Sequence, residues 1–508
     1  MKPSQICGTW IALPVSIFFT ISCSTPANRS TENTSSTIKV IEKTEEDLSR
    51  VSSGFKDNAE PTVDLRDFIK PKFGYHRPDA VAAVLRGRID AYAALTAAMN
   101  HAAKKVRARY AEQPASHRKN HEFNRSSNSN VARVYIPTGQ IWCSGTIQKP
   151  PMVSIIGDGP NSCIYFGAAP DKDLDPKDPR VMVDRDLSWR ASYGKSICIY
   201  CPAKIKYPEG VIHDVNSRIE GIKMQIRADS VGIFMKGTFN NFRVIGNQIG
   251  GWGFSKPKHS SIGVAMVSQP EGGRTLDGYQ APAESGYNFD GAFMNNVLVE
   301  GLEWFLWGTI GYNTRIIGNN IGECRNGLYL SNGIGVLVSS NTFFPIKEHV
   351  ADMDTAIVSN SKSVKITGNL IQGYHQGILL NGRNCSISNN TILMSQDVGG
   401  IQSDGYAIHV VTSRWKSSGK TWGCGGLPSG SGLGGRFWSR EGPIWIRNND
   451  IGFSGKPVRS NYKPIFIEGF SNRNIRYLEA GNTCPDRQPQ NSEMTKSLHA
   501  ENAGKVKS

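Results

Sequence analysis

Residues 325 to 409 hold side chains that can transfer protons or neutralise a carboxylate. A His or Tyr side chain can act as a base or an acid, and an Arg or Lys can offset the charge of a neighbouring carboxylate. Removal of a proton next to a carboxylate requires both kinds of group. We therefore predict a base at His375 or His349, an acid at Tyr329 or Tyr374, and a carboxylate clamp at Arg325 or Lys347.

A second group of residues has the composition of a ligand-binding surface. The segment 412–442 interleaves aromatic and basic residues around a Gly/Ser-rich stretch. Aromatic faces stack on sugar rings, and cations bind carboxylates or sulfates. The alternative is a loop whose Trp residues pack against the side of the domain. The predicted binding residues, including three from neighbouring turns and one from a third strand, are Asp352, Asp354, Asp404, His409, Arg414, Trp415, Lys416, Trp422 and Trp438.

Paired aspartates leave hydrolysis open as another chemistry. Glycoside hydrolysis requires two carboxyl groups about 5 to 9.5 Å apart. The pairs Asp352 with Asp354 and Asp397 with Asp404 are the candidates. The first pair also suits a Ca²⁺ ion, but no dense Asp cluster stands out, so we predict no metal and no other cofactor.

A six-residue phrase explains how the chain positions these groups. Its pattern is apolar, two variable residues, Asn, one variable residue, apolar. The step between most copies is 21 to 28 residues, which is typical of a solenoid whose units bury their apolar faces by stacking. The seven Asn residues are Asn247, Asn296, Asn319, Asn341, Asn369, Asn390 and Asn449.

Stacking these repeats predicts an all-β fold, a single-stranded right-handed parallel β-helix. Asn tolerates a sharp bend, and stacked Asn side chains would form a hydrogen-bonded ladder with a spacing of about 4.8 Å. Residues 364–386 supply the reading frame, with three strands and a turn after each. This frame predicts an outward row on the third strands, forming a groove floor, at Tyr329, Val358, Leu379 and His409.

The N-terminal part carries an export signal and a helix. The run from Trp10 to Ile21 is too short to span a bilayer and reads as a signal peptide. Thr20-Ile21-Ser22-Cys23 resembles a lipoprotein box, which predicts a lipid on Cys23 and an outer-membrane or cell-surface location; otherwise the protein is periplasmic or secreted. Apolar residues at helical intervals predict an amphipathic helix over 90–111. The expected organisation is a signal peptide (1–22), a flexible tether (23–58), an N-terminal cap with a basic insertion (59–130), the β-helix (131–485) and a disordered tail (486–508).

Charge and cysteine content bear on partners and on the compartment. The formal net charge is +15 in 508 residues, which fits an anionic partner. Eight cysteines follow Cys23, and an even number in an exported protein permits disulfides. Cys143 and Cys163 lie about one coil apart, so they are expected to be able to face each other. For Cys198 and Cys201 we favour a structural role over a redox or zinc site.

The segments VDLRDF, VYIPTGQIWCSGTI and SIIGDG, with the Ala-rich helix between the first two, resemble the opening of the pectate-lyase-like superfamily. The resemblance covers residues 63–485. It implies a helix capping the first coil and a polysaccharide-binding groove along the third-strand face. Lyases, hydrolases, epimerases and phage tailspikes share the scaffold, but the Asn-Thr-Asp, Asp-Asp and Gly-His-Gly pattern of polygalacturonases is absent.

A second resemblance concerns the middle coils. GNNIGECRNGLYLSNG, VSSNTFFP and GNLIQGYHQGILLNGRNCSISNN are similar to coils of the inulin fructotransferases. That family uses an acidic pair, and the matching positions here are Gly318 and Tyr329. The resemblance therefore implies the scaffold and not this chemistry.

Together these observations predict an exported lyase that cleaves a uronate-containing polysaccharide by β-elimination. The alternatives are a hydrolase or fructotransferase-like enzyme using paired Asp residues, and a non-catalytic carbohydrate-binding solenoid. The expected partners are an acidic polysaccharide and, through Cys23, a membrane. Nucleic acid is not expected. Solenoids of this superfamily often form homotrimers, but the residues leave the oligomeric state open.

Overall fold

A computed structural model describes the part of the chain that builds the solenoid. All the described residues belong to the second of two compact units, Glu60–Ser508. The described residues are 62–115, 131–184, 195–227, 229–237, 239–251, 261–267, 290–299, 301–345, 355–381, 384–395, 405–411, 443–454, 463–468 and 477–484.

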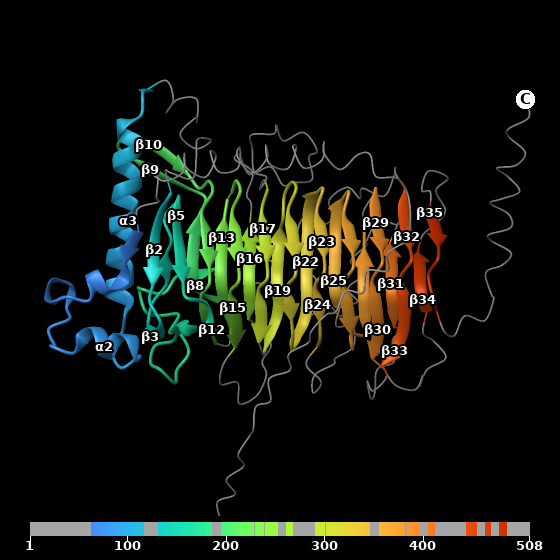
Figure 1. Ribbon diagram of the computed structural model, residues 1–508, viewed down its shortest axis with the longest axis horizontal. Helices are drawn as coiled ribbons and strands as arrows, with labels where there is room; N and C mark the ends of the chain where they lie inside the picture. The colour runs from blue at the N-terminus through green and yellow to red at the C-terminus, as the bar shows by residue number, and fades with distance from the viewer. Residues whose placement is uncertain are drawn as a thin grey trace, which may run out of the picture. The chain divides into compact units, whose positions relative to one another are not determined.

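Three parallel sheets make up a right-handed parallel β-helix, as predicted (Figure 1). Each coil contributes one strand to each sheet, and each strand pairs with its counterpart in the next coil. This winding agrees with the general right-handedness of connections between parallel strands. Sheet 1 has twelve strands: β1 (Thr62–Asp64), β2 (Ala132–Ile136), β5 (Val153–Gly157), β11 (Arg218–Glu220), β14 (Arg243–Ile245), β17 (Ala292–Met294), β20 (Arg315–Ile317), β23 (Leu337–Ser339), β26 (Lys365–Thr367), β29 (Cys385–Ser388), β32 (Ile444–Arg447) and β35 (Tyr477–Ala480).

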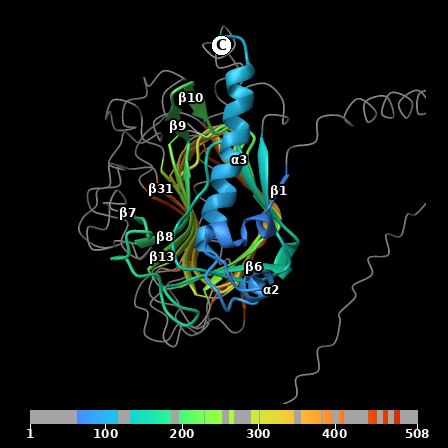
Figure 2. The ribbon, with the colours of Figure 1, turned by 90° about the vertical axis from the view of Figure 1, so that its left-hand side faces the viewer.

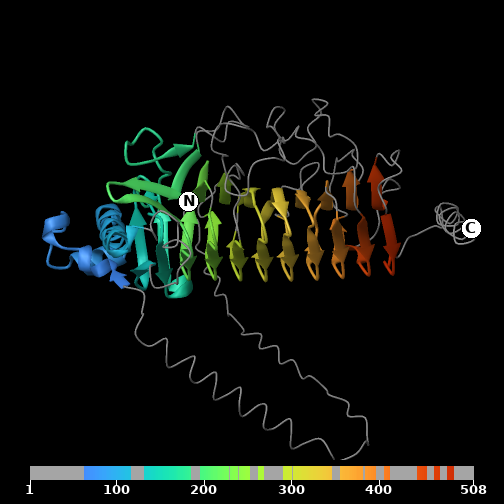
Figure 3. The same ribbon diagram turned by 90° about the horizontal axis from the view of Figure 1, so that it is seen from above.

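Sheet 2 follows the Asn bend in each coil. Its ten strands pair in order along the stack, and Figure 3 shows the successive coils side by side along the solenoid. They are β3 (Gly139–Cys143), β6 (Ser162–Phe166), β12 (Lys223–Ile226), β15 (Gln248–Gly251), β18 (Val297–Val299), β21 (Asn320–Ile321), β24 (Thr342–Phe343), β27 (Leu370–Gln372), β30 (Thr391–Ser395) and β33 (Asp450–Ser454).

Sheet 3 contains the longest strands and carries the candidate residues Arg325, Tyr329 and His409. Ten of its strands run parallel, and β7 (Val183–Asp184) pairs antiparallel with β8 at one end. A separate hairpin consists of β9 (Lys204–Tyr207) and β10 (Gly210–His213). The parallel strands are β4 (Ile147–Gln148), β8 (Lys195–Pro202), β13 (Ser230–Lys236), β16 (Ile262–Val267), β19 (Leu302–Thr309), β22 (Cys324–Ile334), β25 (Thr355–Lys362), β28 (Gln376–Leu380), β31 (Tyr406–Val411) and β34 (Lys463–Glu468).

The predicted Asn ladder is confirmed, and it extends one step further than predicted. Each Asn amide nitrogen donates to the side-chain oxygen of the Asn in the next coil, over 2.8 to 3.1 Å. The same oxygen also accepts the backbone N–H of the preceding Asn. Asn482 extends the ladder by accepting from Asn449. Because donors and acceptors are paired along the row, these polar groups are buried without the cost of unmade hydrogen bonds.

The predicted helix is confirmed as α3 (Tyr92–Glu112), and it lies across the first coil (Figure 2). Its buried residues recur at helical intervals and include Ala94, Ala98 and Ala102, whose small side chains let the helix approach the strands closely. Two tethers fix its start: the Tyr75 hydroxyl donates to the Asp90 carbonyl and accepts the Ala94 N–H. A helix in this position prevents the open sheet end from pairing with other chains. The other helical segments are η1 (Leu65–Phe68), η2 (Pro71–Phe73), α2 (Ala80–Leu85) and η4 (Gly159–Asn161).

A fully buried ion pair joins two early coils. The Lys149 ammonium lies 2.8 Å from the Asp214 carboxylate, and both side chains are 0% exposed. The ammonium also donates to the Val153 carbonyl and the Ser217 hydroxyl, while Asp214 accepts the Met152 N–H. This set of partners satisfies both charges, which a buried pair needs if its attraction is to offset desolvation.

The buried cysteines differ from one expectation. Cys143 pairs in register with Phe166, whereas Cys163 pairs with Gln140, so the two thiols do not face each other. Both are free, as are Cys198 and Cys201. The last two lie in the interior core, in keeping with the structural role that we favoured. No helix in the described part of the chain is both long and apolar enough to cross a membrane.

Candidate functional site

The outward row on sheet 3 has the register predicted from the repeat. Tyr329 pairs with Val358, Val358 with Leu379, and Leu379 with His409. The row continues through Phe466 beyond His409. The three-strand reading frame therefore assigns the correct face to all four predicted positions.

These four positions do not form an open groove floor. Tyr329, Val358, Leu379 and His409 are at most 2% exposed. The first three belong to an apolar cluster that is separate from the interior core. Sheet 3 thus buries side chains on both faces, as parallel sheets usually do. The expected exposure was wrong because outward orientation in a solenoid does not by itself imply contact with solvent.

Aromatic side chains contact one another on this outer face. The Trp307 and Tyr329 rings are stacked with centroids 5.6 Å apart, and Trp304 meets Tyr329 edge-on at 5.8 Å. Further along the row, Tyr406 and Phe466 stack at 5.0 Å. Trp307 and Phe466 are only partly buried. Flat aromatic rings of this kind provide the surfaces on which sugar rings stack.

A row of polar residues marks the corner where sheet 3 begins. Arg325 lies within β22, and its side chain is half-buried. Glu303 occupies the matching position in the preceding coil, because the residues flanking each of them pair in register. His375 stands immediately before Gln376, the first residue of β28, and Arg325 stands in the same way immediately before Asn326. We call Glu303, Arg325 and His375 the corner row.

Register sets the spacing within the corner row. Asn326 accepts the Thr355 N–H, and Thr355 pairs with Gln376, so Arg325 and His375 are two coils apart. At about 4.8 Å per coil, their backbones are separated by about 10 Å. Long side chains at that separation can reach one sugar residue placed over the coil between them.

Gly405 leaves room beside the His375 ring. An added Cβ at Gly405 would lie 3.5 Å from His375 Cε1 and 3.7 Å from Nδ1, so the ring packs against a residue with no side chain. His375 itself is 6% exposed. His409 packs differently, against the Tyr406 and Phe466 rings at 4.7 and 5.2 Å. The two histidines therefore occupy separate environments, and only His375 lies in the corner row.

Tyr374 lies elsewhere than expected. Its side chain is 0% exposed and belongs to the interior core, not to the edge of a groove. The hydroxyl donates to the Cys324 carbonyl over 3.0 Å. This bond satisfies a buried polar group and ties the turn before β28 to β22, two coils away.

Sequence reasoning missed Glu303, which is 1% exposed. Its place beside Arg325 becomes visible only when the two strands are aligned coil by coil, because LEWFLW and CRNGLY share no obvious motif. The remaining sequence-predicted positions lie outside the described residues: Cys23, Lys347, His349, Asp352, Asp354, Asp397, Asp404, Arg414, Trp415, Lys416, Trp422 and Trp438.

Comparison with known families matches only the middle coils. A model of the family described as periplasmic copper-binding protein (NosD) matches residues 291–419, a segment that begins with β17 and includes β31. Among the residues that the structure describes, no three His, Cys, Asp or Glu side chains form a group that could hold a metal ion. No curated protein sequence matches the chain.

Three solved structures are similar to this chain at low identity. The mannuronan C-5 epimerase AlgE6 A-module of Azotobacter vinelandii is 13% identical over 83% of this chain and 100% of its own, with a TM-score of 0.38. DFA-IIIase from Arthrobacter chlorophenolicus A6 is 10% identical over 82% of this chain and 92% of its own, with a TM-score of 0.42. ORF18 of Geobacillus virus E2 is 10% identical over 89% of this chain, which spans 66% of that protein, with a TM-score of 0.37. Likenesses of this degree carry no assignment of chemistry. The parallel β-helix itself, which the sequence resemblance implied, is the fold of this chain.

Proposed function

We propose that this chain is an exported enzyme that binds a uronate-containing polysaccharide and cleaves it by β-elimination. The observation that carries the proposal is the corner row, where Arg325 and His375 lie two coils apart at the edge of the aromatic face of sheet 3. A cation and a potential base at this separation can act on the same uronate residue.

The proposed reaction assigns one task to each group. The Arg325 guanidinium pairs with the uronate carboxylate and stabilises the charge that develops when the adjacent C–H proton leaves. His375 accepts that proton. The electron pair of the C–H bond forms a carbon–carbon double bond, and the bond to the glycosidic oxygen breaks. The leaving oxygen takes a proton from an acid, the role for which the sequence predicts Tyr329 on the same strand as Arg325, although its side chain is 2% exposed.

Glu303 is a positioning residue in this scheme. It occupies the same corner position as Arg325 in the preceding coil. In the proposal the Glu303 carboxylate orients the Arg325 guanidinium of the next coil. His349 and Lys347 remain alternative candidates for the base and the clamp, and the aromatic rings of sheet 3 supply the stacking surface.

A non-catalytic carbohydrate-binding role is the second candidate, and the low exposure of His375 favours it. The two candidates differ in whether the polymer is cut. Alginate, pectate, glucuronan and glycosaminoglycans should each be incubated with the full chain, with ultraviolet absorbance and new reducing ends followed together. A rise in both signals supports the lyase, and new reducing ends without an absorbance rise support a hydrolase. If both signals are absent, the lyase and the hydrolase are both ruled out.

Variants then test the assignment of the residues. His375→Ala should lower the rate by about 10²- to 10⁴-fold, the usual contribution of a general base. His101→Ala, which removes an exposed histidine from α3, is the matched control and should leave the rate unchanged. Retention of full activity in His375→Ala would overturn the base assignment.

Export and anchoring belong to the same proposal. The support is the signal-like segment 1–22 and the lipobox-like sequence before Cys23. We expect a Cys23→Ser variant to leave the membrane fraction, whereas the unchanged protein stays with it. Equal partition of the two proteins would contradict the lipid anchor.

A further inference from the structure

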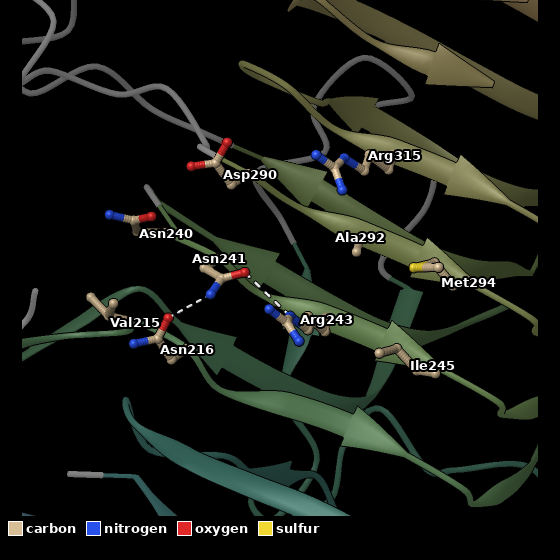
Figure 4. A pocket seen from close by; sticks show the side chains of 10 residues that line it. All are labelled: Val215, Asn216, Asn240, Asn241, Arg243, Ile245, Asp290, Ala292, Met294 and Arg315. Atoms are coloured by element: carbon tan, nitrogen blue, oxygen red, sulfur yellow. Dashed lines mark hydrogen bonds between the residues drawn. The ribbon is translucent and has the colours of Figure 1, made fainter. Parts of the chain in front are cut away.

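A polar hollow of about 570 Å³ lies on the outer face of sheet 1, away from the corner row. Strands β14, β17 and β20 form its floor, and turn residues that precede the strands form its rim (Figure 4). Nothing in the proposed reaction uses this surface. Its residue types, two arginines among amide and carboxyl groups, indicate a site for an anion.

Two arginines face the hollow across a short side chain. Arg243, Ala292 and Arg315 pair in register on three successive strands. Figure 4 shows the two guanidinium groups on either side of Ala292. At about 4.8 Å per strand, the arginine backbones are about 10 Å apart. Because Ala292 has only a methyl group, the space between the guanidiniums stays open.

The arginines have unused donors. Arg243 Nε donates to Asn241 Oδ1 over 3.2 Å, and Asn241 in turn donates to Asn216 Oδ1 over 2.6 Å. These bonds orient the Arg243 guanidinium, and among the described residues its two terminal nitrogens have no partner. Arg315 has no hydrogen bond or ion pair with any described residue, and both arginines are exposed.

The rest of the lining suits a sugar better than a bare ion. Asp290 carries the one carboxylate of the hollow and accepts from Asn313 Nδ2 over 3.3 Å, without pairing with either arginine. A carboxylate repels an inorganic anion but accepts hydrogen bonds from sugar hydroxyls. Ile245 and Met294, paired in register, add an apolar surface for the C–H groups of a ring.

We propose that this hollow is a second binding site for acidic sugar residues of an oligosaccharide. Arg243 and Arg315 bind carboxylates, Asp290 and Asn241 bind hydroxyls, and the gap over Ala292 accommodates the unit between the two carboxylates. The sugar assignment rests on the proposed function. The site binds the polymer on a different sheet from the one where it is cut, so it holds substrate or product without taking part in the reaction.

The test is calorimetric titration of the full chain with a short uronate oligosaccharide. It is done in the unchanged protein and in His375→Ala, so that binding is measured whether or not the oligosaccharide is cut. Arg243→Gln and Arg315→Gln should each weaken binding at this site by about tenfold, as expected for loss of one charge-assisted contact. Ala292→Leu, which keeps both charges and fills the gap, should weaken it similarly.

Lys365→Gln is the matched control. Lys365 is an exposed cation in the same outward row, on β26 and outside the hollow. It should change the affinity by less than about twofold. Equal effects of the control and the arginine variants, or no effect of Ala292→Leu, would mean that the oligosaccharide is held only by general electrostatic attraction. Either result would overturn the proposal.

Two ligand controls define the chemistry. A carboxyl-reduced oligosaccharide should bind at least tenfold more weakly, by the same loss of charged contacts. Sulfate at matched charge should compete poorly. Strong competition by sulfate would overturn the sugar assignment. If no uronate polymer is cleaved yet the oligosaccharide binds as described, the reaction proposal fails and this site stands.

Discussion

Removing one side chain from the middle of the Asn ladder should destabilise the solenoid locally and strongly. The Asn341 amide nitrogen donates to the Ile316 carbonyl over 2.9 Å and to Asn369 Oδ1 over 3.0 Å. Its oxygen accepts the Asn319 backbone N–H over 2.9 Å and the Asn319 amide over 2.8 Å. Asn341→Ala deletes all four bonds at a residue that is 1% exposed.

The expected cost follows from these four bonds. At about 1 kcal/mol for each, the loss is about 4 kcal/mol, and it includes an Asn319 N–H left buried without its acceptor. Asn482→Ala, at the end of the ladder, removes three bonds from a half-exposed residue, so we expect about 1 to 2 kcal/mol. Asn320→Ala is the matched control, since Asn320 is exposed and adjacent to the ladder; its effect should stay within about 0.5 kcal/mol.

Amide hydrogen exchange resolved by peptide is the suitable assay, because a stacked solenoid need not unfold in one step. The free energy of local opening should fall in the peptides that contain Asn319 and Asn341. Exchange in Asn341→Ala equal to that in Asn320→Ala would refute the view that the ladder stabilises the bends.

Three further predictions concern buried titratable groups. Lys149→Met should lower the free energy of unfolding in urea by about 3 to 5 kcal/mol, because it leaves the Asp214 carboxylate buried without a counter-charge. Adding Asp214→Leu should recover part of this loss. A loss below about 1 kcal/mol in the single variant would contradict the account. Burial raises the pKa of Tyr75 from 10.0 to about 12, so the buried phenol resists ionisation in the folded state. The stability that the neutral Tyr75 hydroxyl contributes is therefore fully present below pH 10 and is lost as the pH rises towards 12. Tyr75→Phe should therefore reduce the alkaline loss of stability, and an unchanged pH profile would disprove this. Burial also raises the pKa of the Cys163 thiol to about 11 and that of the Cys201 thiol to about 12. Neither thiol should therefore react with a thiol reagent at neutral pH until the protein unfolds. Rapid labelling of these two cysteines in the native protein would contradict their burial.

The architecture could be predicted from the sequence because the Asn bend recurs with nearly constant spacing. One strong local constraint in each coil sets the register of all three strands, which is why Tyr329, Val358, Leu379 and His409 fall in one row. Asn482 escaped notice because Glu479 stands where the phrase has an apolar residue.

The environment of the candidate residues could not be predicted in the same way. Tyr374 follows a strand and reads as a turn residue, yet its ring fills the interior and its hydroxyl binds the Cys324 carbonyl. Burial of Tyr329 depends on what covers the outer face of sheet 3, and a repeat within the coils carries no information about that cover. Glu303 comes next to Arg325 only through the pairing of β19 with β22. Contacts between coils are set by the fold as a whole, not by local sequence.

The chemical identity of the newly formed chain ends tests the proposed function most directly. The full chain and His375→Ala should be incubated with the responsive uronate polysaccharide, and the products analysed by mass spectrometry. We predict that the unchanged protein releases fragments with an unsaturated sugar at the new non-reducing end, lighter by one water molecule than hydrolysis products, and that His375→Ala releases almost none. Saturated fragments, or unsaturated fragments released equally by both proteins, would contradict β-elimination with His375 as the base.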